Sequence, residues 1–272
     1  MRHLGWKPFA LAALVVMTLV TSVLPADARS QMSFESNGRS VRVEAFRAEG
    51  VGRKPAVMIL HGASGLGDGT LLYPLARELN DRGINAYVVR YFDGLGQGQP
   101  AARPAKGQRA QPVRGNPSSP SLHATRDRIL QDALAFIARQ PTVDSDRIGI
   151  FGLSLGGFHA LDIASRDPRI QATVSFVGAM PNGGGERALG QMPPTLLLHG
   201  TADRVVPFAR VQTLHRQMTA AGAPVQMVTF PGAGHSFRPG DLQRAHETAA
   251  DFLERALTTR GGRDTLVAFR RF

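Results

Sequence analysis

The sequence predicts an α/β fold in which helices flank a doubly wound, mostly parallel sheet. Short continuous apolar runs, such as Ala56–Leu60 and Thr195–Leu198, are typical of strands that are buried on both faces of a sheet. These runs alternate along the chain with longer segments whose apolar residues recur at helical spacing. Because the connections are short, we expect residues 29–272 to form a single domain.

The elements can be placed in order along the chain. Val41 and Val43 alternate with polar residues and predict a first strand over Ser40–Ala45, at an edge of the sheet. Further strands are predicted at Ala56–Leu60, Ile84–Tyr91, Ile148–Phe151, Ala172–Val177, Thr195–Leu198 and Val225–Phe230. Helices are predicted at Thr70–Arg82, Leu122–Arg139, Pro207–Ala221 and Leu242–Leu257, with another directly after Ile148–Phe151.

The segment Asp93–Pro120 shows neither pattern. It contains five glycines, five prolines, four basic residues and one acidic residue. A segment this long without periodicity, inside a compact domain, is typical of a functional lid or of a mobile insertion. The sequence leaves both interpretations open.

Residues 1–28 have the pattern of a secretory signal peptide. Arg2 and Lys7 precede the apolar run Phe9–Val23, and the small residues of Ala26–Ala28 form a cleavage site. The run has 15 residues, whereas a helix needs about 20 to span a bilayer. We therefore expect a periplasmic or secreted mature protein without stable membrane insertion; the alternative is an uncleaved N-terminal anchor.

Composition excludes some classes of chemistry. Cysteine is absent, which excludes a thiol nucleophile and thiolate metal sites. The net charge is +11, but basic residues do not cluster with aromatic ones, so we expect no nucleic-acid partner. The scattered charges are typical of a solvated surface.

A candidate nucleophile lies where the strand Ile148–Phe151 ends. Gly152, Ser154 and Gly156 form a Gly-x-Ser-x-Gly pattern between this strand and a helix, which is typical of a nucleophile elbow. Glycines are needed because strand and helix approach too closely for β-carbons. The alternative interpretation is an ordinary tight turn.

A serine hydroxyl needs an adjacent base, and a histidine is the usual one near neutral pH. His235 directly follows the last predicted strand, at the sheet edge where sites form in α/β folds. A loop histidine without a role is the alternative. His61 and His199 each precede a glycine at a strand end, which indicates loop packing instead.

The base in turn needs a carboxylate that orients it. Asp203 follows the strand Thr195–Leu198, so the chain order is serine, aspartate, histidine. Alternatively, Asp203 caps the helix near Pro207. For the oxyanion we expect the backbone N–H groups of Leu155 and Ala63, with Ser64 as the alternative to Ala63.

Four motifs along the chain can be read together. They are Leu60-His61-Gly62-Ala63-Ser64-Gly65, Gly152-Leu153-Ser154-Leu155-Gly156-Gly157, His199-Gly200-Thr201-Ala202-Asp203-Arg204-Val205-Val206-Pro207 and Gly232-Ala233-Gly234-His235-Ser236-Phe237. In combination they resemble the α/β-hydrolase superfamily, nearest to its dienelactone hydrolase-like branch. The resemblance covers about residues 41–257 and implies an α/β-hydrolase fold that cleaves small-molecule esters or lactones through an acyl-enzyme, without cofactor or metal.

Two positions depart from that branch. Dienelactone hydrolases proper use cysteine as the nucleophile, where this chain has Ser154, and they carry a glutamate where Gly62 stands. These departures favour a general serine esterase, with Ser154, His235 and Asp203 as its triad. A peptidase or an acyltransferase would use the same three residues, and a non-catalytic binding protein on the same scaffold is the other alternative. The sequence does not reveal the oligomeric state.

Overall fold

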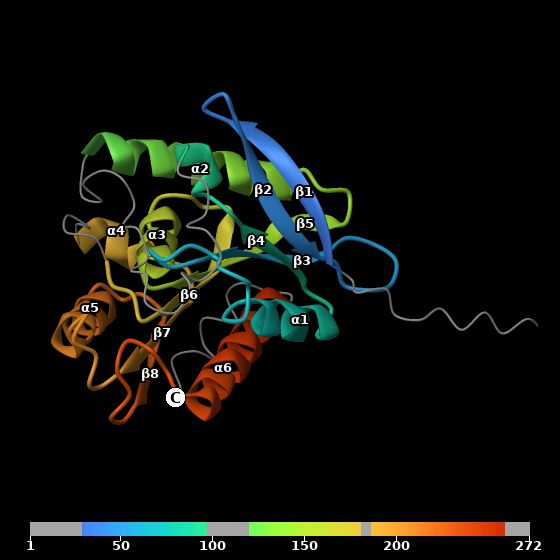
Figure 1. Ribbon diagram of the computed structural model, residues 1–272. Coiled ribbons are helices and arrows are strands. Elements are labelled where there is room, and N and C mark those ends of the chain that lie inside the picture. The colour runs from blue at the N-terminus through green and yellow to red at the C-terminus, as the bar shows by residue number, and fades with distance from the viewer. Residues whose placement is uncertain (1–28, 97–119, 181–185, 259–272) are drawn as a thin grey trace, which may run out of the picture.

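The computed structural model describes residues 29–96, 120–180 and 186–258 (Figure 1). The predicted signal peptide, most of the segment Asp93–Pro120, and residues 181–185 and 259–272 lie outside the described residues.

The described strands form one eight-stranded sheet. They follow the order β1-β2-β4-β3-β5-β6-β7-β8, in which β1, β2 and β4 pair antiparallel and all later pairs are parallel. The predicted doubly wound, mostly parallel sheet is therefore confirmed. The strands are β1 (Arg29–Ser36), β2 (Arg39–Phe46), β3 (Lys54–Leu60), β4 (Asn85–Val89), β5 (Val143–Leu153), β6 (Ile170–Phe176), β7 (Thr195–Gly200) and β8 (Val225–Phe230).

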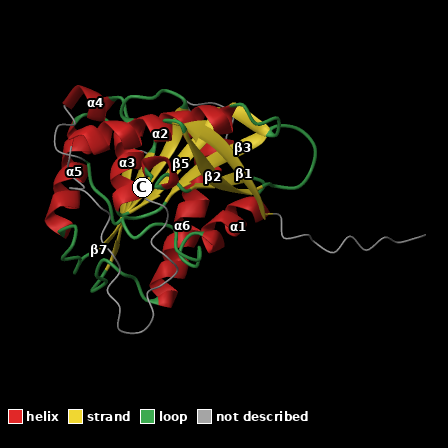
Figure 2. Ribbon diagram, turned by 45° about the horizontal axis from the view of Figure 1, so that its top comes forward, coloured by secondary structure: helices red, strands yellow, loops and turns green. Residues whose placement is uncertain are grey.

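Helices cover both faces of this sheet (Figures 1 and 2). One face packs against α2, α3 and α5, and the other face packs against α1 and α6. The short helix α4 contacts α5. The helices are α1 (Tyr73–Asp81), α2 (Pro120–Ala138), α3 (Leu155–Ala164), α4 (Glu186–Gly190), α5 (Phe208–Ala220) and α6 (Pro239–Thr258), together with the 3₁₀ helix η1 (Asp93–Leu95).

The prediction that the first strand lies at a sheet edge is wrong. The predicted Ser40–Ala45 corresponds to β2, and β1 pairs with its outer side. The two strands join at Asn37 and Gly38, both with positive φ (52° and 68°). Asn-Gly is the preferred sequence of a two-residue hairpin turn because both central residues must adopt positive φ.

Two short helices were also not predicted. η1 occupies the first residues of the segment Asp93–Pro120, and that segment's last residue begins α2. The five-residue α4 is too short to show helical periodicity in the sequence. The remaining predicted elements differ from the observed ones mainly at their ends, which is where sequence patterns are least informative.

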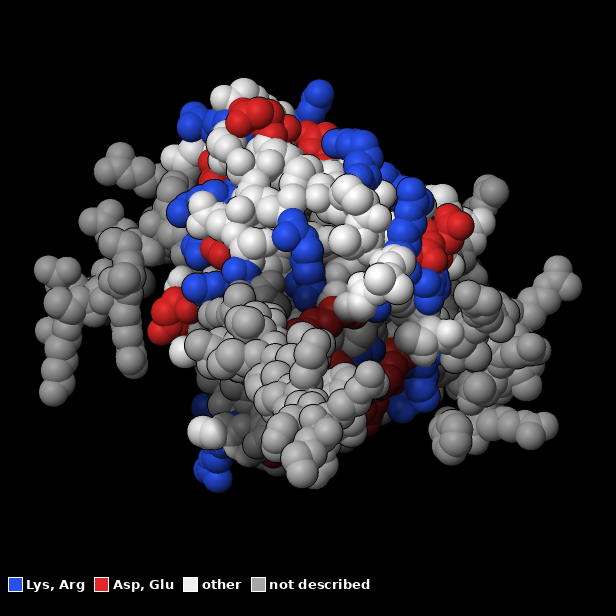
Figure 3. All heavy atoms as spheres, turned by 90° about the vertical axis from the view of Figure 1, so that its right-hand side faces the viewer, with Lys and Arg blue, Asp and Glu red and all other residues white. Residues whose placement is uncertain are grey.

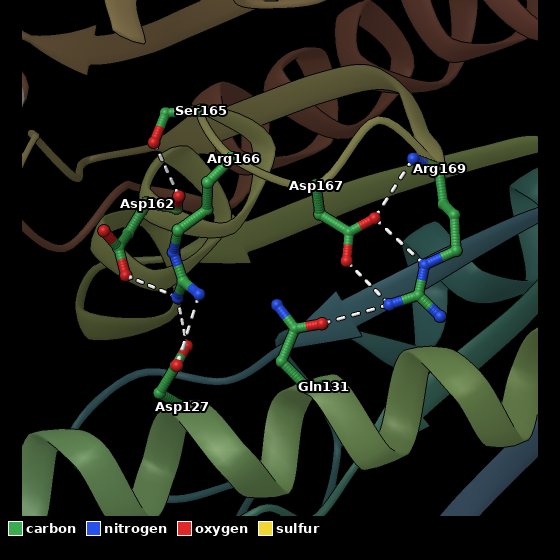
Figure 4. A network of polar contacts seen from close by, with 7 residues as sticks. All are labelled: Asp127, Gln131, Asp162, Ser165, Arg166, Asp167 and Arg169. Carbon is green, nitrogen blue, oxygen red and sulfur yellow. Dashed lines mark hydrogen bonds and ion pairs between the residues drawn. The ribbon is translucent and has the colours of Figure 1, made fainter.

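A polar network fixes α2 against the turn between α3 and β6 (Figure 4). Arg166 binds carboxylates from both α2 and α3, and Arg169 donates to the Gln131 side chain of α2 at 3.0 Å. Asp167 in turn holds the Arg169 guanidinium, with the Nη2 to Oδ2 distance at 2.6 Å. The network thereby ties α3, the helix that follows Ser154, to its neighbour at the end far from the serine.

Charged side chains of both signs share the face seen in Figure 3. Lys and Arg lie there among Asp and Glu rather than in one continuous patch. Within the described ranges, no helix combines the length and the apolar character that crossing a bilayer requires.

Candidate active site

The carboxyl edge of the sheet brings together three side chains that are distant in sequence. Ser154 follows β5, Asp203 lies in the loop after β7, and His235 lies in the loop after β8. Because these strands are parallel, their carboxyl ends lie at the same edge. All three side chains proposed from the sequence therefore converge.

Ser154 occupies a sharp and strained turn. Its φ is 52° and its ψ is −113°, a conformation that residues with a β-carbon rarely adopt. A β-carbon at Gly152 would overlap the Gly156 carbonyl, and one at Gly156 would overlap the Leu60 carbonyl of β3. The strand-to-helix turn therefore requires glycine on both sides of the serine.

A chain of two hydrogen bonds links the three residues. Ser154 Oγ lies 2.9 Å from His235 Nε2, and His235 Nδ1 lies 2.8 Å from Asp203 Oδ2. Because a carboxylate only accepts hydrogen bonds, Nδ1 carries the proton, which leaves Nε2 free to accept from the serine hydroxyl. This tautomer is the one that can take a proton from Ser154.

Asp203 is held as an anion. Burial raises the pKa of its carboxyl, but N–H donors from His235, Val206 and Val205 outweigh burial, so the pKa lies below its usual value. The two backbone donors reach Oδ1 at 2.8 Å and 2.9 Å. The carboxylate is therefore both charged and fixed in orientation beneath His235.

His199 is a neighbour of Asp203 that sequence reasoning assigned only to loop packing. Its Nε2 lies 2.9 Å from the Val206 carbonyl oxygen and 3.4 Å from Asp203 Oδ2. Burial lowers the pKa of His199, with the Val206 hydrogen bond opposing it. A neutral His199 therefore packs under the carboxylate and supports the loop that carries it. The available signal in the sequence was its position directly after the predicted strand Thr195–Leu198, four residues before Asp203.

Of the two residues expected to bind an oxyanion through their N–H groups, Leu155 directly follows Ser154 and Ala63 follows Gly62, a neighbour of Ser154. Leu155 is the first residue of α3, and no side chain caps that helix. Ala63 lies in a turn closed by the Gly65 N–H and the Gly62 carbonyl oxygen at 3.1 Å. Gly62 itself lies against Ser154, because a β-carbon built there would be 3.5 Å from the serine Cβ.

His61 directly precedes this turn and packs into the core beneath it. It is fully buried, and its ring stacks on Tyr91 with the centroids 4.1 Å apart. The Tyr91 hydroxyl donates to the His61 carbonyl at 2.7 Å. Burial, partly opposed by a hydrogen bond to Gly62, lowers the pKa of His61 to about 4, so its ring is neutral near pH 7.

A cavity of about 380 Å³ opens beside Ser154 and His235. Leu153, Phe176 and Phe237 form part of its wall, and Leu71, Val205 and Leu242 also contribute. These apolar residues come from separate loops, from the ends of β5 and β6, and from α6, and sequence reasoning did not identify them as lining a cavity. Ser154 lines the cavity, whose volume is sufficient for a small molecule.

Metal ligands do not gather in the part of the chain that the structure describes. Across residues 29–96, 120–180 and 186–258, no group of three or more His, Asp or Glu side chains is arranged to hold an ion. The described site combines a serine hydroxyl, an imidazole and a carboxylate.

The sequence as a whole identifies the family. Residues 41–259 match the family model described as "Dienelactone hydrolase family". The chain belongs to the dienelactone hydrolase family. As a member of this family it is classed with hydrolases, in agreement with the resemblance seen in its motifs.

Curated relatives of this dienelactone hydrolase family member match it over different lengths. It is 27% identical over 225 residues to "Uncharacterized protein YfhR" of Escherichia coli K12, covering 73% of the chain and 70% of the relative. It is 31% identical over 116 residues to a "Putative carboxymethylenebutenolidase" of Methylorubrum extorquens, covering 40% of each protein. The chain spans only 27% of the length of a "Putative phosphoribosyl transferase" of Mycobacterium tuberculosis, at 34% identity.

Solved structures show the same fold. The dienelactone hydrolase-like promiscuous phosphotriesterase P91 from metagenomic libraries superposes with a TM-score of 0.66 at 19% identity, over 84% of this chain and 98% of that one. Est1E from Butyrivibrio proteoclasticus superposes with a TM-score of 0.63 at 15% identity, over 84% of this chain and 99% of that one. The family member therefore has the α/β-hydrolase fold.

Proposed function

We propose that this chain is an exported serine hydrolase that cleaves carboxylic esters or lactones through an acyl-enzyme intermediate. The observation that carries the proposal is the hydrogen-bond chain from Ser154 through His235 to Asp203, with distances of 2.9 Å and 2.8 Å, at the wall of a cavity. Membership of a hydrolase family supports it.

In the first half of the reaction, Ser154 Oγ attacks the carbonyl carbon of the ester while His235 Nε2 takes the hydroxyl proton. Asp203 stabilises the imidazolium that forms. The negative charge that develops on the carbonyl oxygen is bound by the N–H groups of Leu155 and Ala63. His235 then gives its proton to the leaving alkoxide, and the acyl group stays on Ser154.

In the second half, water replaces the alcohol as the attacking group. His235 takes a proton from the water, whose oxygen bonds to the acyl carbon. When the resulting intermediate collapses, Ser154 Oγ leaves and recovers a proton from His235. The products are a carboxylic acid and an alcohol, which are parts of one hydroxy acid when the substrate is a lactone.

Export is the part of the proposal that rests on sequence alone. The basic start at Arg2 and Lys7, the apolar run Phe9–Val23 and the small residues of Ala26–Ala28 are those of a cleavable signal peptide. N-terminal sequencing of the protein recovered from the periplasm or medium tests it, and a mature start at Arg29 is expected. Recovery of the full chain in the membrane fraction would contradict it.

The hydrolase proposal is tested with purified protein from residue 29 onward and a panel of esters, lactones and aminoacyl amides. Hydrolysis of short esters is expected for the wild type and should be lost in Ser154→Ala. Ser165→Ala, which changes a serine just past the far end of α3, serves as the matched control. Cleavage of amides alone would instead indicate a peptidase, and activity retained by Ser154→Ala would refute the mechanism.

A further inference from the structure

The cavity beside Ser154 has an uncharged wall. Apart from His235, its lining within the described residues contains no Asp, Glu, Lys or Arg. Arg204 and Arg238 are adjacent in sequence to lining residues, but both are exposed and neither lines the cavity. Among the described residues, the cavity thus offers apolar contact and no Lys or Arg side chain that could bind a carboxylate.

The apolar surface continues from this wall to the outside of the protein. Among the described residues, three large hydrophobic side chains are strongly exposed, namely Val51, Leu71 and Val205. Two of these, Leu71 at 49% and Val205 at 68% exposure, line the cavity. They come from different loops, after β3 and after β7, and they give the cavity an apolar rim. The rim and the inner wall together define an apolar path through the cavity.

The interior end of the path is built from aromatic rings. Phe176, the last residue of β6, packs edge to face against Phe237 with the centroids 4.7 Å apart. Phe237 also contacts the ring of buried Phe230 at 4.7 Å. A wall made of packed rings is fixed in position, so it selects by shape and polarity rather than by adapting to a charged group.

From this wall and rim we infer the substrate class, which rests on the proposed hydrolase function. The site takes neutral esters with an apolar acyl or alcohol group that lies along the path from Phe237 to Leu71 and Val205. It discriminates against esters that carry a carboxylate on that group.

Two physical effects set the expected selectivity. Each methylene that leaves water for an apolar wall favours binding by about fourfold, so activity rises with chain length until the cavity of about 380 Å³ is filled. A carboxylate placed in the same cavity loses hydration without gaining a partner. It therefore reduces kcat/KM by more than about tenfold relative to the neutral ester of the same length.

The inference is tested with two matched substrate pairs. On the acyl side, 4-nitrophenyl pentanoate is compared with the mono-4-nitrophenyl ester of glutaric acid; on the alcohol side, pentyl acetate is compared with 5-acetoxypentanoic acid. We expect at least a tenfold preference in kcat/KM for the neutral member of one pair. Equal or better cleavage of the charged member in both pairs would overturn the inference but leave the hydrolase intact, whereas cleavage of none would overturn both.

Rim variants test the location of the path. Val205→Arg and Leu71→Arg place a cation at the rim, and Val51→Arg adds the same charge at a 99% exposed position that does not line the cavity. Each rim variant should lower the ratio of pentanoate to acetate cleavage several-fold and improve cleavage of the glutarate ester. The inference is wrong if Val51→Arg shifts these ratios as much as the rim variants do.

Discussion

The strained backbone at Ser154 predicts that glycine at this position gives a more stable protein than alanine does, which reverses the usual order. With φ at 52° and ψ at −113°, a residue with a β-carbon is strained by about 1–3 kcal/mol. Ser154→Ala keeps that strain, whereas Ser154→Gly relieves it. Glycine normally costs about 0.5–1 kcal/mol relative to alanine through the entropy of the unfolded chain. The glycine variant should therefore be the more stable, by up to about 2.5 kcal/mol.

The comparison isolates the backbone, because both variants lose the same hydroxyl and the same hydrogen bond to His235. The free energy of unfolding is measured by urea denaturation, supported by thermal melting. For a domain of this size, about 1 kcal/mol corresponds to a change of about 2–4 °C in Tm. If alanine is the more stable by the usual amount, Ser154 is not strained and the reasoning from the elbow geometry fails.

Three further predictions follow from the same contacts. Asp203→Asn should reduce kcat by on the order of 10⁴-fold because His235 would lose the anion that fixes its tautomer; a loss of under tenfold in steady-state ester hydrolysis would contradict this role. Gly156→Ala should unfold at lower urea or fail to fold, because its β-carbon would overlap the Leu60 carbonyl, whereas Gly240→Ala, whose β-carbon meets no atom within 4 Å, should melt like the wild type. Burial lowers the pKa values of His61 and His246 to about 4, against opposing backbone hydrogen bonds. Between about pH 4 and pH 6.5, each histidine is neutral in the folded protein but protonated in the unfolded chain. The free energy of unfolding should therefore fall as the pH drops through this range, by up to about 3 kcal/mol per histidine. Equal urea midpoints at pH 7.5 and pH 4.5 would refute this prediction.

The nucleophile turn was predictable because its requirements are local. Gly152 and Gly156 lie where a β-carbon would overlap neighbouring backbone. Both glycines and the serine fall within five consecutive residues, so the sequence shows the motif directly. The partners Asp203 and His235 were predictable for a different reason. In a parallel sheet, the loops that follow the strands all lie at the same edge. The positions of Asp203 and His235 directly after predicted strands were therefore enough to place both residues near Ser154.

Features that depend on loop conformation were not predictable. Val205 and Leu71 form one rim only because two separate loops fold toward each other, and no sequence pattern links the two residues. The support that His199 gives to Asp203 depends on a distance of 3.4 Å that no spacing rule encodes. β1, by contrast, was recognisable in principle from Asn37-Gly38, since this pair is a strong local hairpin signal.

The central claim is that the hydroxyl of Ser154 is a nucleophile activated by His235. Reaction with a fluorophosphonate, followed by peptide mass spectrometry, tests it without knowledge of the natural substrate. The account predicts a single covalent adduct on the peptide containing Ser154, formed far more slowly in His235→Ala. An unlabelled Ser154 in folded wild-type protein, or labelling unaffected by His235→Ala, would contradict it.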